Sequence, residues 1–135
     1  MTGRISLLLA QACFLLSCCL AAGAHPLQSR EYLTPKEVDL VKDAQELDKR
    51  IEVFTKAADR RVVVIKGLSA TSSKELKKDS ELWGDLPSGT RGELVGDIAK
   101  ILDEAITNID DVSARDEKNP ALPRSLRKLA VAASR

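Results

Sequence analysis

The chain has few of the residues that carry metal, redox or thiol chemistry. Its three cysteines, Cys13, Cys18 and Cys19, all precede residue 20, its one histidine is His25, and its one methionine is Met1. The rest of the chain therefore has no means of forming a disulfide, a Cys-ligated zinc site or an iron–sulfur cluster. Haem ligation by His or Met and a Glu-x-x-His di-iron site are excluded for the same reason. We expect no cofactor and no metal site.

Aromatic residues and net charge are also scarce. Beyond residue 24 the aromatic residues are Tyr32, Phe54 and Trp83, too few for the stacking platforms that bind bases or sugars. The chain carries 21 basic and 20 acidic side chains, so its formal net charge is only +1. A chain this close to neutral offers no electrostatic reason to expect nucleic acid as a partner.

What is present at the N-terminus is the pattern of a secretory signal peptide over residues 1–24. Arg4 supplies a positive charge, residues 5–20 are mostly apolar, and Ala22-Gly23-Ala24 has the small residues that signal peptidase recognises. Cleavage between Ala24 and His25 would leave a mature chain without cysteine. The pattern predicts export to the periplasm or the extracellular space.

Two alternatives for this segment remain open. Residues 5–20 are of marginal length for a membrane-spanning helix, which needs about 20 apolar residues, and no basic stop follows them. Leu15-Leu16-Ser17-Cys18 resembles a bacterial lipobox, in which Cys18 would be lipidated. We expect no stable membrane insertion unless Cys18 carries a lipid.

The remaining chain predicts a flexible leader over residues 25–33 and one helical domain over residues 34–135. Thr34-Pro35-Lys36-Glu37 is a capping box with Pro at the first helical position. Apolar residues then recur in steps of three and four, which predicts one long helix from about 35 to 65 that Gly67 closes.

Further helix signals follow in the second half of the chain. Ser72-Ser73-Lys74-Glu75 is a capping box that opens a short helix, which ends at Gly84. A third box, Thr90-Arg91-Gly92-Glu93, begins a long amphipathic helix that fades near Asp116, and a last helix begins at Pro123. The sequence therefore predicts an all-α fold, an antiparallel bundle of three or four helices with a long first helix. The last helical pattern reaches Arg135 without a terminating signal, so the chain is either frayed there or part of something longer.

Carboxylates are the remaining candidates for chemistry. They cluster on the first and third long helical stretches, mostly opposite the apolar stripe and interleaved with bases, which is typical of a solvated helix face. The residues concerned are Asp43, Glu46, Asp48, Asp97, Asp103, Glu104, Asp110 and Asp111. We expect no catalytic site and no enzyme; an enzyme that uses only carboxylates, Ser and Lys is the least favoured hypothesis.

The apolar stripe of the first helix is the feature that points to a function. A stripe longer than the other helices can cover would need a protein partner or a second copy of the chain. We therefore expect an interface that includes Leu47, Ile51 and Phe54, with Trp83 as its anchor. The alternative for Trp83 is that it plugs the end of the bundle.

Two stretches resemble uncharacterised exported bacterial helical proteins: residues 33–50, from Leu33-Thr34-Pro35 to Asp48-Lys49-Arg50, and residues 97–105. That resemblance implies no activity, cofactor or site residue. The function we expect is an exported, non-catalytic interaction or structural module of the cell envelope. The alternative is a carrier that binds a small apolar ligand between its helices.

Overall fold

The computed structural model describes residues 30–67 and 75–134, and its secondary structure there is helical. The expected signal peptide with Cys18, Ala24 and His25 lies outside the described residues, as does most of the capping box that begins at Ser72. These features stay predictions. Within the described part of the chain, no helix has the length and hydropathy to cross a bilayer.

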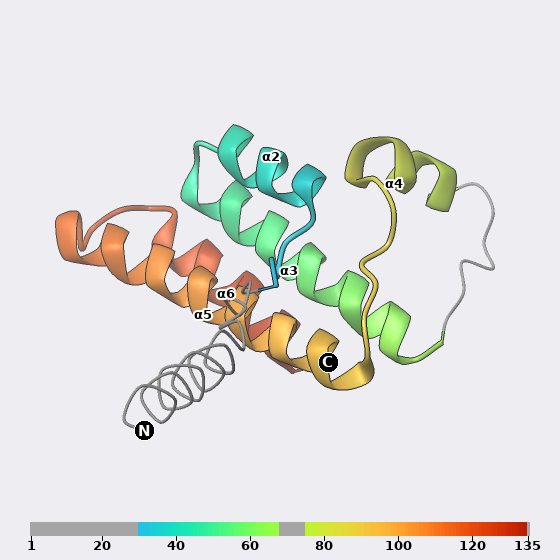
Figure 1. The fold of residues 1–135 in the computed structure, drawn as a ribbon. Coiled ribbons are helices and arrows are strands. Elements are labelled where there is room, and N and C mark those ends of the chain that lie inside the picture. Colours follow the sequence, from blue (N-terminus) through green and yellow to red (C-terminus); the bar gives the residue numbers. More distant parts are fainter. Residues whose placement is uncertain (1–29, 68–74, 135) are drawn as a thin grey trace, which may run out of the picture. The chain divides into compact units, whose positions relative to one another are not determined.

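Five helices make up this structure: α2 (Pro35–Asp43), α3 (Leu47–Ile65), α4 (Glu75–Trp83), α5 (Arg91–Arg115) and α6 (Leu122–Ala133). Helices α3, α5 and α6 pack against one another, whereas α2 packs on α3 and on α4. Figure 1 shows that α2 runs back along α3, and that α5 and α6 form a second antiparallel pair beside α3. The expected all-helical fold is confirmed, with five described helices instead of three or four.

Short-range sequence signals set most of the helix ends. Thr34 and Thr90 each accept a hydrogen bond from the backbone N–H three residues on, and Glu37 and Glu93 complete the two capping boxes. Gly84 follows the last residue of α4 with a φ of 68°, a left-handed conformation that suits glycine at a helix C-terminus. These predicted ends are therefore confirmed.

The expected continuous helix from 35 to 65 is wrong, because the chain turns back at residues 44–46. Ala44 leaves the helical region with φ −76° and ψ 87°, and Arg50 Nε donates a 3.0 Å hydrogen bond to the Ala44 carbonyl. Neither glycine nor proline marks this corner. A contact between distant residues accompanies it: Glu37 in α2 pairs with Arg60 and Arg61 in α3.

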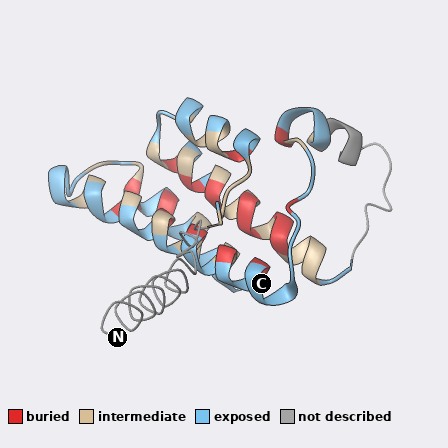
Figure 2. Cartoon of the chain, in the orientation of Figure 1, coloured by how far each residue is buried: buried red, intermediate tan, exposed pale blue. Residues whose placement is uncertain are grey.

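The core lies where α3, α5 and α6 meet, and Trp83 at the end of α4 also belongs to it. Its buried side chains are Ile51, Phe54, Ala57, Ala58, Trp83, Ile101, Ala105, Ile109 and Leu122. Figure 2 shows buried positions recurring along the described helices between exposed ones. Tyr32 and Leu33, which belong to the expected leader, also pack against this core. Ordered packing thus begins before α2.

Candidate functional site

A fully buried carboxylate, Glu37, lies at the centre of a polar cluster inside the described fold. As the third residue of α2, it accepts the backbone N–H of Thr34 at 2.9 Å on Oε2. Arg61 binds both of its oxygens at 2.7 Å in a bidentate pair, and Arg60 Nη1 donates to Oε1 at 2.9 Å. One carboxylate therefore joins the start of α2 to two guanidinium groups of α3.

The guanidinium group of Arg60 also binds the end of α4 and the residues that follow it. Arg60 donates to the backbone carbonyls of Trp83, Gly84 and Asp85 at 3.0, 2.9 and 2.6 Å. Carbonyls at a helix C-terminus carry partial negative charge, so this is a favourable place for a cation. The Arg60 guanidinium also lies 5.6 Å from the centre of the Trp83 ring, within cation–π range. Arg60 thus attaches the end of α4 to α3.

Burial disfavours the charged form of Arg60. Desolvation lowers the pKa of Arg60 below its usual range, the Glu37 carboxylate opposes the shift, and the neighbouring Arg61 charge lowers the pKa further. An arginine remains protonated at neutral pH despite such a shift. Arg61 is further held by the carbonyls of Tyr32 and Ala57 at 2.6 and 2.7 Å. The cluster is a structural clamp: both terminal nitrogens of Arg61 donate to fixed partners, whereas its buried Nε has no hydrogen-bond partner.

A groove of about 520 Å³ lies between α2, α3 and α4, the three helices that the clamp connects. Apolar side chains from all three helices line it: Leu40, Ala44, Val53, Leu82 and Trp83. Charged and polar side chains complete the lining: Lys49, Glu52, Thr55, Lys56, Asp59 and Asp79. Lys56 and Asp79 form a 2.8 Å ion pair that links α3 to α4. Leu82 is 58% exposed, so an apolar side chain lies open to solvent in this groove.

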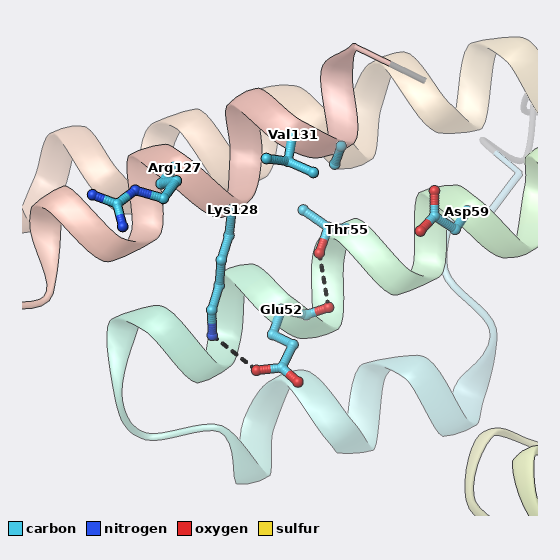
Figure 3. Close-up of a pocket in the computed structure, with 7 residues that line it drawn as sticks. Glu52, Thr55, Asp59, Arg127, Lys128 and Val131 are labelled. Atoms are coloured by element: carbon cyan, nitrogen blue, oxygen red, sulfur yellow. Dashed lines mark hydrogen bonds and ion pairs between the residues drawn. The ribbon is translucent and has the colours of Figure 1, made fainter.

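A smaller groove of about 330 Å³ lies between α3 and α6 (Figure 3). Lys128 of α6 donates to Glu52 Oε2 at 2.9 Å and to the Asp48 carbonyl at 3.1 Å. Thr55 donates its hydroxyl proton to the Glu52 carbonyl at 3.0 Å, so no base activates this hydroxyl as a nucleophile. The polar groups of this groove join two helices, and they do not converge on a common point in Figure 3.

The residues expected to form an interface lie inside the fold. Ile51 and Phe54 belong to the buried core, Trp83 is 9% exposed, and Leu47 is half-buried and packs on the same core. The structure therefore brings all four around one core. For Trp83 this placement agrees with the alternative that it plugs one end of the helices, with Arg60 on its ring.

The expected solvated carboxylates divide into two groups. Asp43, Glu46, Asp103, Asp110 and Asp111 are exposed and Glu104 is half-buried, but Asp48 and Asp97 are buried. Asp48 is covered where Lys128 reaches across from α6, 3.8 Å from its carboxylate. Among the described residues, no group of His, Cys, Asp and Glu has the arrangement of a metal site.

Sequence reasoning missed the clamp of Glu37, Arg60 and Arg61. One signal was available: Arg61 falls within the apolar series of α3, where a charged side chain needs a buried partner. Glu37 gave no such signal, because a glutamate at that position of a capping box is normally exposed.

The chain matches no protein-family model, no curated protein and no solved structure in the comparisons made. The resemblance to exported bacterial helical proteins therefore stays a prediction.

Proposed function

We propose that the protein is an exported, non-catalytic interaction module of the cell envelope, and that it binds an apolar segment of a protein partner in the groove between α2, α3 and α4. The observation that carries the proposal is an open groove with apolar side chains from three helices. Buried ion pairs hold α2 against α3, and Arg60 binds the end of α4, so we expect the groove to be formed before a partner binds. Preorganisation of this kind lowers the entropic cost of binding.

The charges around the groove indicate the kind of segment that fits. The lining has two basic side chains, Lys49 and Lys56, and three acidic ones, so the rim has only a weak excess of negative charge. An amphipathic helix with an apolar face and mixed polar flanks matches this lining. Export itself rests on the pattern of residues 1–24.

A small apolar ligand is the second candidate. The groove volume of about 520 Å³ lies within the range of small-molecule sites, roughly 300–1,000 Å³. Such sites normally enclose most of their ligand, whereas Leu82 and the Lys56–Asp79 pair leave this groove open. The openness favours a protein segment.

Site-specific photo-crosslinking in cells tests the proposal. A photoreactive side chain replaces Leu82 in the groove, and the matched control replaces Val131, which is 49% exposed on α6. We expect a protein adduct of one defined mass from position 82 only, and we expect Lys56→Glu to reduce its yield by about tenfold or more.

Native mass spectrometry of the same purified protein covers the small-ligand alternative. A co-purifying apolar molecule that Leu82→Glu abolishes, together with no protein adduct at position 82, would overturn the protein-binding proposal. Equal adducts from positions 82 and 131 would also contradict it.

A further inference from the structure

Helix α4 is the least anchored of the described helices. It packs on α2, whereas α3, α5 and α6 pack on one another. The structure describes the side chains of residues 79–83 in this helix, and among them Trp83 is buried while the others are exposed or half-buried. Within this stretch, Trp83 alone belongs to the apolar core.

Polar contacts supply the rest of the attachment, mainly at the C-terminal end of α4. Arg60 of α3 donates three hydrogen bonds to the carbonyls that end this helix, and it lies on the Trp83 ring. A second contact from α3, the ion pair of Lys56 with Asp79, joins side chains that are 42% and 46% exposed, so water screens it. One guanidinium group and one indole ring therefore supply most of the attachment to α3 and the core.

A hinge lies at the same end of the helix. Gly84 follows α4 with a φ of 68°, a conformation that glycine adopts without a steric cost. Figure 1 shows a non-helical connection from there to α5, which begins at Arg91. Pro87, in the middle of this connection, is buried. A rotation between Gly84 and Pro87 therefore moves the end of α4 and leaves α5 in place.

Release of α4 would leave the clamp between α2 and α3 intact. Arg60 would keep its 2.9 Å ion pair with Glu37, so its buried charge would not lose its anion. The release breaks three carbonyl bonds and exposes Trp83, and the core between α3, α5 and α6 stays packed. Elements with few buried apolar contacts open at a lower free energy than the whole protein unfolds.

We infer that α4 opens and closes as one unit about Gly84, and that this motion controls the groove between α2, α3 and α4. In the closed state α4 supplies Asp79, Leu82 and Trp83 to the groove lining, and opening withdraws them. A segment that binds in the groove binds the closed state, so its apparent affinity scales with the fraction of closed chains. This control rests on the function proposed for the groove, whereas the opening of α4 does not.

Hydrogen exchange measured by mass spectrometry tests the opening without any partner. The chain is purified from cells that express the full sequence, and its processed form is fixed by intact mass. A nine-residue helix is not stable alone in water, so its amides exchange whenever α4 is released. We expect peptides that contain residues 79–84 to exchange about hundredfold faster than peptides from the centre of α3, with a weaker dependence on denaturant.

Substitution of Arg60 tests what holds α4 closed. Arg60→Met should speed the exchange of α4 by about tenfold or more, because three hydrogen bonds from a charged group are lost. Arg50→Met is the matched control, because Arg50 also lies in α3 and also binds a carbonyl, but its described bonds go to Ala44 and Asn108. It should change the exchange of α4 by less than about twofold. Circular dichroism checks that both variants are folded.

Photo-crosslinking from position 82 tests the control of the groove. The yield of the protein adduct in cells should fall by about tenfold or more in Arg60→Met and stay unchanged in Arg50→Met. If the unchanged chain gives no adduct at all, the function proposed for the groove fails, while the opening of α4 is still decided by hydrogen exchange.

The opening is wrong if α4 and α3 exchange at the same rate and with the same dependence on denaturant, since the two helices would then open together. It is equally wrong if α4 shows no protection, or if a folded Arg60→Met variant exchanges α4 as slowly as the unchanged chain. A full adduct yield in Arg60→Met, together with faster exchange of α4, would show that α4 opens but does not control the groove.

Discussion

Glu37 is the residue whose loss should cost the described fold most. Its carboxylate offsets the charge of Arg61 and part of the charge of Arg60 where neither side chain reaches water. A buried ion pair adds little net stability over an apolar replacement, but breaking one leaves an uncompensated charge. We therefore expect Glu37 to specify how α2 docks on α3 more than to add net stability.

Glu37→Gln keeps the size of the side chain and its capping role but removes the charge. We expect the free energy of unfolding to fall by about 3–5 kcal/mol, because two buried guanidinium groups lose their anion. Denaturant titration measures this free energy. Glu93→Gln is the matched control, because Glu93 has the same capping-box position at the start of α5 and is exposed; it should change stability by less than about 1 kcal/mol. Equal losses in both variants would contradict a role for the buried pairs.

At the scale of elements, local sequence signals predicted several helix ends. They did not predict that α2 folds back on α3. The capping boxes at Thr34 and Thr90 and the glycine at position 84 act within one turn of chain, so the sequence alone identifies them. The corner at residues 44–46 accompanies the contact of Glu37 with Arg61, 24 positions later. The apolar spacing continues across that corner and therefore predicted a single helix.

The same cause explains the interface predicted for α3. A first helix about 45 Å long would have been too long for the other helices to cover. Leu47, Ile51 and Phe54 would then have remained exposed. Because α2 folds back, its Leu40 and Val41 pack against the core that contains Ile51 and Phe54. The open apolar positions lie instead at Leu82 and along α5 and α6, where they depend on tertiary packing.

The contact between α3 and α6 should be sensitive to acid. The hydrogen bond from Lys128 is the main reason that the pKa of Glu52 is below its usual 4.5. A carboxyl whose pKa is lowered by folding stabilises the fold above the unfolded pKa and loses that contribution as the pH falls through the folded value. Glu52→Gln should therefore reduce the loss of stability below about pH 4.5, by under about 1 kcal/mol because Glu52 is exposed.

Thermal unfolding in steps from neutral to acid pH measures this effect. Glu117→Gln, in the connection between α5 and α6, is the control for removing a carboxylate from the surface. An acid transition of Glu52→Gln that superimposes on that of the unchanged chain would show that the Lys128–Glu52 contact contributes nothing.

At the scale of the whole molecule, α3 separates two kinds of surface. Helix α2 packs on it, α4 packs on α2 and is bonded to α3 through Arg60, and these three helices line the groove. Helices α5 and α6 also pack on α3, and Val95, Ile106 and Leu126 remain exposed on them. The described residues contain no cysteine, so packing and the buried cluster alone hold these parts together. Arg60 holds α4, and with it one side of the groove, against α3.

Acrylamide quenching of the single tryptophan, Trp83, tests that claim directly. In the unchanged chain Trp83 is buried, so its fluorescence should be poorly quenched. Arg60→Met removes the three bonds to the residues that end α4, while Glu37 keeps its bidentate pair with Arg61. Lys56→Met is the matched control, because it removes only the exposed ion pair to Asp79 of α4.

We predict that Arg60→Met raises the quenching constant about threefold or more while the helicity is retained, and that Lys56→Met leaves it nearly unchanged. If Trp83 stays equally shielded in a folded Arg60→Met variant, Arg60 does not hold α4 and the groove has another origin.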